Sequence, residues 1–270
     1  KLGLYGFSYQ GFTQLTGELN SKPPDCLSPA MTGMNIKDHW CSDGGAYWWH
    51  NNIAWGLQIA ALKMKRENNL FEWEKIRLAL ENKSYLREGI DILKKYDPNS
   101  FVLEWLKNLN NACPFEEFKP ISTWIKQPML IIGGLWDPHL KGAFDLYKKS
   151  KEAGGSPEII IGNATHLNWW EGSQESLLKF FDKHLKSDEK FNSKNLKDEK
   201  KIWNISLNKW EELDNKFHPE FIFGLKSDGT ANVDVEDGSL TINSKGSGWF
   251  TIVNDPWRPT PSDGGHLGPN

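Results

Sequence analysis

The sequence contains few cysteines, has no long apolar run and carries little net charge. Cys26, Cys41 and Cys113 are too few and too scattered along 270 residues to predict a disulfide framework or a zinc site. No apolar stretch approaches the roughly 20 residues that a membrane-spanning helix needs, so no membrane partner is predicted. The formal net charge of −3 implies no nucleic acid or other polyanion as a partner.

Tryptophan, in contrast, is abundant, with 14 residues. Three of them cluster within eight positions of the chain, and two more are adjacent further on. Large aromatic side chains commonly line sites for apolar ligands, although packing explains most of them. The candidate ligand contacts are Trp48, Trp49, Trp55, Trp136 and Trp169.

A G-x-S-x-G pattern lies close to the start of the chain, in Gly6-Phe7-Ser8-Tyr9-Gln10-Gly11. An apolar segment (residues 1–5) precedes it and predicts the end of a buried strand, and residues 12–19 predict a short helix. Strand, sharp turn and helix are the setting of a nucleophile elbow, in which the serine adopts a strained backbone conformation. Gly6 and Gly11 would remove the Cβ atoms that collide where strand and helix approach. This context favours Ser8 as a nucleophile over a simple turn.

Only one strand precedes this predicted elbow, whereas several normally precede it in an α/β hydrolase. We therefore expect the 270 residues to be an internal piece of a longer protein, or one chain of a split one. The intact mass of the source protein checks this expectation.

A serine nucleophile requires a base and an acid, which follow it in that fold in the order Ser, acid, His, on loops after strands. Asp137 directly follows an apolar run at 128–134, and His166 directly follows another at 158–162. We therefore predict Ser8, Asp137 and His166 as a catalytic triad. His139 is expected to cap or pack near the acid loop, whereas His39 is a weaker candidate for facing a ligand.

The elements divide the chain into zones. The β-α-β-α alternation from 128 to 185 predicts a parallel sheet with crossover helices at 143–153 and 174–185. Helices predicted at 55–66, 70–80, 85–96 and 101–109 form a helical insertion without a credible strand. Period-two segments at 202–207, 220–225, 239–242 and 248–253 predict a β-sandwich. The domains expected are a partial α/β hydrolase (1–26 and 127–187), a helical cap (27–126) and a partial jelly roll (201–270).

Three motifs resemble those of the CocE/NonD hydrolases, a group that includes cocaine esterase, α-amino acid ester hydrolases and X-prolyl dipeptidyl-peptidases. They are the elbow, Gly133-Gly134-Leu135-Trp136-Asp137-Pro138-His139-Leu140-Lys141-Gly142, and Thr165-His166 with Trp169. Residues 180–186 resemble the helix that closes the family's catalytic domain, and 254–261 resemble part of its jelly roll.

The resemblance implies an α/β-hydrolase fold with an inserted cap and an acyl-enzyme mechanism that needs no cofactor. It also implies that the backbone N–H of Tyr9 contributes to the oxyanion hole. The family's second donor, a tyrosine hydroxyl, belongs to a segment before the elbow.

The substrate is expected to be a small acyl ester or amide, with esters favoured because their hydrolysis is chemically easier. Asp38 and Asp43 are candidates for holding a substrate ammonium group, as X-prolyl peptidases and amino-acid ester hydrolases require. A ligand-binding protein with a vestigial elbow stays open, and it predicts no labelling of Ser8 by a fluorophosphonate. A homo-oligomer also stays open, and a cytoplasmic location is the default expectation.

Overall fold

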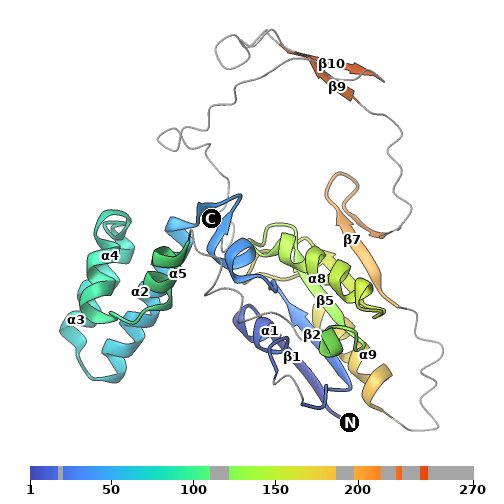
Figure 1. Ribbon diagram of the computed structural model, residues 1–270, viewed down its shortest axis with the longest axis horizontal. Coiled ribbons are helices and arrows are strands. Elements are labelled where there is room, and N and C mark those ends of the chain that lie inside the picture. Colours follow the sequence, from blue (N-terminus) through green and yellow to red (C-terminus); the bar gives the residue numbers. More distant parts are fainter. Residues whose placement is uncertain (18–20, 110–121, 187–197, 214–222, 227–237, 243–270) are drawn as a thin grey trace. The chain divides into compact units, whose positions relative to one another are not determined.

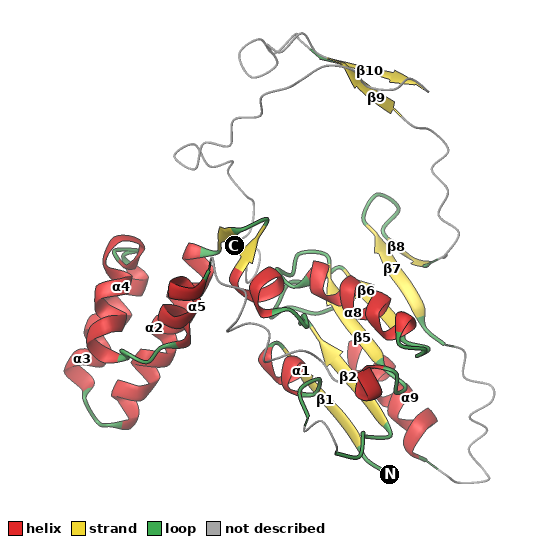
Figure 2. Ribbon diagram, in the orientation of Figure 1, coloured by secondary structure: helices red, strands yellow, loops and turns green. Residues whose placement is uncertain are grey.

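A computed structural model of the chain describes residues 1–17, 21–109, 122–186, 198–213, 223–226 and 238–242. Residues up to Glu212 form one compact unit, and the described residues from Leu213 onward belong to a second. The first unit is a mixed α/β structure with a mainly parallel central sheet, as the alternation of elements predicted (Figure 2).

The central sheet has six strands in the order β1-β2-β5-β6-β7-β8. The first five are parallel, and β8 pairs antiparallel with β7. Every residue of β5 and β6 is buried, which explains why their sequences are apolar apart from Glu158 at the start of β6. Figure 1 shows β1, β2 and β5 side by side. The strands are β1 (Gly3–Phe7), β2 (Cys26–Ala30), β5 (Leu130–Gly134), β6 (Glu158–Gly162), β7 (Lys200–Asn204) and β8 (Lys209–Glu212).

Helices cover both faces of this sheet. Phe180 of α9 (Ser173–Leu185) packs with Leu130, Ile132 and Ile160. Gly133, on the opposite face because strand side chains alternate, lies against Ala143 of α8 (Leu140–Glu152). The short helix α1 (Tyr9–Thr13) follows β1, and α7 (Ser122–Ile125) precedes β5.

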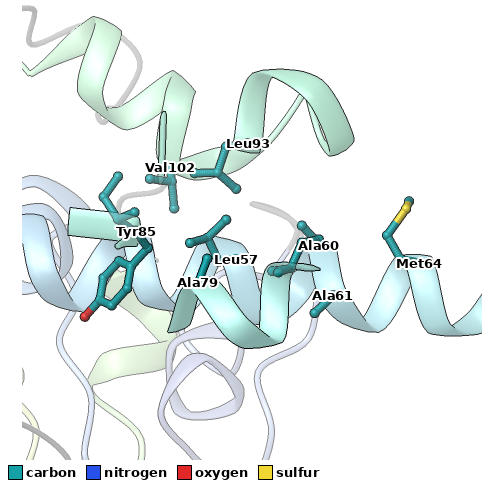
Figure 3. Close-up of a cluster of buried hydrophobic side chains, with 10 residues drawn as sticks. Leu57, Ala60, Ala61, Met64, Ala79, Tyr85, Leu93 and Val102 are labelled. Carbon is teal, nitrogen blue, oxygen red and sulfur yellow. The ribbon is translucent and has the colours of Figure 1, made fainter. Parts of the chain in front are cut away.

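Between β2 and β5 the chain contains the predicted helical insertion. A π-helical turn η1 (Lys37–Cys41) and a small hairpin, β3 (Ser42–Asp43) with β4 (Ala46–Tyr47), lead into it. Its helices enclose their own core, in which Leu57 lies below Leu93 and Val102 (Figure 3). The helices are α2 (Trp49–Arg66), α3 (Leu70–Glu81), α4 (Tyr85–Tyr96) and α5 (Phe101–Asn108).

Several strands differ from the sequence prediction, among them β3 and β4 in the insertion and β8, none of which was predicted. The segment from residue 27 was expected to be helical and without a strand, yet β2 lies inside the sheet, between β1 and β5. Pro29 and Ser28 weaken the strand signal, and Pro29 also has no N–H for a sheet ladder. The strand expected at 202–207 in the β-sandwich instead begins at Lys200 as β7 and pairs with β6.

In the second unit, β9 (Phe223–Lys226) and β10 (Ser239–Ile242) form an antiparallel pair. Two more of the predicted period-two segments, at 220–225 and 239–242, therefore contain strands. The strand predicted at 248–253 and the family-like segment at 254–261 lie outside the described residues, so the jelly roll stays a prediction. Among the described residues, no helix has the length and apolarity needed to cross a membrane.

The core of the helical insertion generates a stability prediction. Leu57 is fully buried on α2, whereas Leu62 on the same helix is about half exposed. Leu57→Ala should lower the free energy of unfolding by about 2–5 kcal/mol, because it leaves a cavity among packed helices. The matched control Leu62→Ala should change it by less than about 0.5 kcal/mol. Urea denaturation followed by circular dichroism measures both, and equal losses would contradict the packing described.

Candidate active site

The elbow serine lies at the junction of β1 and α1. Ser8 has φ 58° and ψ −133°, an unfavourable conformation for a residue with a side chain. Its N–H donates to the Ala30 carbonyl at 2.9 Å, and its own carbonyl accepts from the N–H groups of Gly11 and Phe12. These hydrogen bonds hold the turn between β2 and the helix α1.

The two glycines of the motif are required by close packing. A Cβ on Gly11 would lie 2.9 Å from Thr32 Cγ2 and 3.1 Å from the Ala30 carbonyl oxygen. A Cβ on Gly6 would lie 2.8 Å from Gln10 Cβ. The prediction that these positions must lack side chains is therefore confirmed.

A continuous chain of hydrogen bonds joins three residues that are far apart in the sequence. His166 Nε2 lies 2.9 Å from Ser8 Oγ, and His166 Nδ1 lies 2.5 Å from Asp137 Oδ2. Because a carboxylate only accepts, Nδ1 carries the proton and Nε2 presents its lone pair to the serine hydroxyl. Such an arrangement can remove a proton from the hydroxyl as it attacks a carbonyl carbon.

The parallel sheet brings these residues together. Ser8, Asp137 and His166 follow β1, β5 and β6, and the carboxyl ends of parallel strands lie at one edge of the sheet. The last two loops also bond to each other, since the N–H groups of Leu135 and Trp136 donate to the carbonyls of Gly162 and Ala164. The acid and the base are therefore held on one rigid frame.

Aromatic side chains surround His166. Trp169 Nε1 donates to the His166 carbonyl at 3.1 Å, and the centroid of the Phe7 ring lies 5.7 Å from that of His166 and 5.9 Å from that of Trp169. Trp136 is 55% exposed, and its indole N–H donates to Asn163 Oδ1 at 2.7 Å. Trp169 therefore supports the histidine loop, while Trp136 presents an open aromatic surface directly before Asp137.

The other predicted aromatic contacts, Trp48, Trp49 and Trp55, pack against two different parts of the chain. Trp48 lies 6.1 Å from the His139 ring, and Trp55 lies 6.0 Å from Trp40, which sequence reasoning did not select. Trp49 instead donates from its indole to the Leu86 carbonyl of α4 and is engaged within the helical insertion. The structure thus associates Trp48 and Trp55, but not Trp49, with residues next to the acid loop.

His39, a weak candidate for facing a ligand, is paired with a carboxylate at the edge of the protein interior. His39 is 3% exposed, and its Nε2 lies 2.9 Å from Asp145 Oδ2 of α8. His39 therefore faces the protein interior, where Asp145 is its partner. Nothing in the sequence indicated this pairing, because the two residues are 106 positions apart.

Asp38 and Asp43, the candidates for an ammonium site, already have partners. Asp38 Oδ2 accepts from Asn35 Nδ2 at 2.9 Å, and Asp43 Oδ1 lies 3.9 Å from Lys141 Nζ. Asp38 is therefore hydrogen-bonded within the chain, whereas the contact of Asp43 is a long ion pair between exposed side chains.

The described cysteines are poor nucleophiles. Cys26 in β2 and Cys41 in η1 are buried, and burial raises the pKa of each thiol to about 11. Both thiols are therefore protonated at neutral pH, and thiolate is the reactive form. Within the described ranges, no group of three His, Cys, Asp or Glu side chains could hold a metal ion.

A strained serine bonded to an imidazole, which is itself bonded to a carboxylate, at the carboxyl edge of a mainly parallel sheet, is the arrangement of α/β hydrolases. The family model of the X-Pro dipeptidyl-peptidase (S15) family matches residues 1–168, more than half of the chain. The chain belongs to this family, which agrees with the resemblance found in its motifs. A comparison with curated proteins gave no match.

The close packing at the elbow generates a prediction. Gly11→Val should lower the free energy of unfolding by about 1–3 kcal/mol, because the added carbons enter space occupied by Thr32 and the Ala30 carbonyl. Gln10→Val, on the exposed face of the same helix, is the matched control and should stay within about 0.5 kcal/mol of the parent protein. Urea denaturation measures the difference, and a Gly11→Val protein as stable as its control would show that the elbow tolerates side chains.

Proposed function

We propose that this protein is a serine acyl hydrolase that acts through Ser8, His166 and Asp137. The observation that carries the proposal is the hydrogen-bonded chain from Ser8 Oγ through both ring nitrogens of His166 to Asp137 Oδ2. Membership of a hydrolase family supports it. The strained backbone of Ser8 supports it further, because strain of this kind gathers at reactive residues.

In the proposed reaction, Ser8 Oγ attacks the acyl carbonyl while His166 Nε2 takes the hydroxyl proton. Asp137 keeps the proton on Nδ1 and stabilises the imidazolium that forms. His166 then returns its proton to the leaving group, and an acyl-enzyme remains. A water molecule, deprotonated by the same histidine, hydrolyses this ester and restores Ser8.

The backbone N–H of Tyr9 is the proposed donor to the oxyanion. Tyr9 is the first residue of α1, so its N–H has no acceptor within that helix. It directly follows the nucleophile, where the first oxyanion donor of an elbow lies. Removing one such donor typically lowers kcat by about 10²- to 10³-fold.

We propose esters with an apolar acyl or leaving group as the first substrate class. Phe7, Tyr9 and Trp136 are each at least one-third exposed and lie beside Ser8 or Asp137 in the chain. Apolar surfaces of this kind favour binding of an apolar group next to the reacting carbonyl. Trp48 and Trp55 are further proposed contacts, from the side of the helical insertion.

Dipeptide release from X-Pro substrates is the second candidate, favoured by the family to which the chain belongs. This reaction requires a site for the substrate's ammonium group. Asp38 accepts a hydrogen bond from Asn35, and Asp43 lies 3.9 Å from Lys141, whose positive charge opposes a substrate ammonium group beside it. Esters therefore rank first.

The test is hydrolysis of p-nitrophenyl esters and X-Pro p-nitroanilides by the complete protein. Ser8→Ala should reduce turnover to the background rate, and Asp137→Asn should lower kcat by about 10⁴-fold because it favours the wrong tautomer of the histidine. Asp182→Asn, an exchange of the same type on α9, should leave activity unchanged. A fluorophosphonate should label the parent protein at Ser8, and absence of labelling would instead favour a ligand-binding protein.

A further inference from the structure

A second histidine, His139, lies directly beside the proposed catalytic residues. Its backbone N–H donates to Asp137 Oδ1 at 2.7 Å, while Asp137 Oδ2 is bonded to His166. Both oxygens of this buried carboxylate therefore have a donor, one from the proposed base and one from His139. The direction of the carboxylate depends on where the backbone of His139 is held.

The His139 ring is fixed and neutral. Its Nδ1 lies 2.6 Å from the His39 carbonyl oxygen, which only accepts, so Nδ1 carries the proton. Burial lowers the pKa of His139 to about 4. The charge of nearby His166 also lowers this pKa, whereas the negative charge of Asp137 raises it. The ring packs on Trp40, with centroids 4.2 Å apart, and lies 5.4 Å from the His166 ring. A neutral His139 puts no second positive charge beside His166 when that residue takes a proton.

The carbonyl that anchors His139 belongs to a rigid segment. His39 in η1 accepts the Asn35 N–H at its Nδ1, 3.2 Å away, and its Nε2 bonds to Asp145 of α8. Its ring occupies the space in which a Cβ on Gly33 would lie, only 2.5 Å from His39 Cβ. The turn that leads toward the helical insertion is thereby attached to α8. The His39 carbonyl in this turn is therefore a fixed acceptor.

We propose that His139 is a positioning residue, which rests on the proposed function of the site. Its ring N–H, anchored on the His39 carbonyl, fixes the backbone N–H that orients Asp137 toward His166. The essential property is one hydrogen-bond donor at the position of Nδ1. A side chain of similar shape without a donor should not hold Asp137 in this orientation, whereas a smaller side chain with a donor should hold it.

The experiment compares His139→Phe, which keeps a ring against Trp40 but has no donor, with His139→Asn, whose side-chain amide can donate to the His39 carbonyl. We expect the rate of fluorophosphonate labelling at Ser8 to fall about 10-fold or more in His139→Phe, as when other orienting groups are removed. His139→Asn should stay within about threefold of the parent protein. With an ester substrate, the loss should be in kcat, with KM nearly unchanged.

Two further measurements separate positioning from folding. Thermal unfolding reports whether each variant is folded, and the low-field proton resonance of His166 Nδ1–H reports its hydrogen bond to Asp137 without any turnover. This resonance should be present in the parent protein and in His139→Asn, and should weaken or shift upfield in His139→Phe. His50→Phe, a histidine exchange in the helical insertion where His50 bonds to Tyr85, should label at the parent rate.

The outcomes test the positioning role of His139 separately from the proposed function of the site. A folded His139→Phe variant with normal labelling and a normal resonance overturns the positioning role. A folded His139→Asn variant that loses more than about 10-fold also overturns it, and this arm remains decisive if the Phe variant does not fold. If the parent protein shows the low-field resonance but no labelling at Ser8, the proposed function fails, while the resonance in His139→Phe still tests the positioning role.

Discussion

The structure of the site depends on one strained residue, Ser8. Its positive-φ backbone conformation costs on the order of 1–3 kcal/mol for a residue with a Cβ. Three backbone hydrogen bonds, one from its N–H and two to its carbonyl, offset that cost and join the end of β1 to β2 and α1. The strain directs Oγ out of the turn and toward His166, so the same geometry that is unfavourable for the backbone makes the hydroxyl accessible to its base.

The parallel sheet supplies the other half of the geometry. Ser8, Asp137 and His166 lie on three loops at the same edge of the sheet. These loops follow β1, β5 and β6, and β2 lies between β1 and β5. Hydrogen bonds between the acid loop and the histidine loop reduce their relative freedom. The helical insertion can therefore lie between β2 and β5 in sequence without displacing the acid, because the strand pairing fixes where the chain must return.

The sequence predicted the elements whose signals are local. The helix at 85–96 and the strand at 158–162 have the predicted bounds, since one has a strong amphipathic pattern and the other a run of isoleucines. It did not predict β2, where Pro29 breaks the pattern, nor the partner of β7, because pairing between strands leaves no local mark. For the site, strand-then-loop placement was enough to select Ser8, Asp137 and His166, which the structure joins by hydrogen bonds. The contacts of His139 with His39, and of His39 with Asp145, arise only from the three-dimensional approach of η1 to α8.

Burial of Asp137 explains why the hydrogen bonds of the site run in a defined donor-to-acceptor direction. Its carboxylate side chain is fully inaccessible to solvent, and an ionised group in that position is costly unless each oxygen has a donor. The two donors lie on different elements, the His166 ring and the His139 backbone, so the carboxylate can satisfy both in only one orientation. That orientation keeps the proton on His166 Nδ1 and leaves the lone pair of Nε2 for Ser8. The polarity of the whole chain of hydrogen bonds therefore follows from the requirement that a buried charge be fully paired.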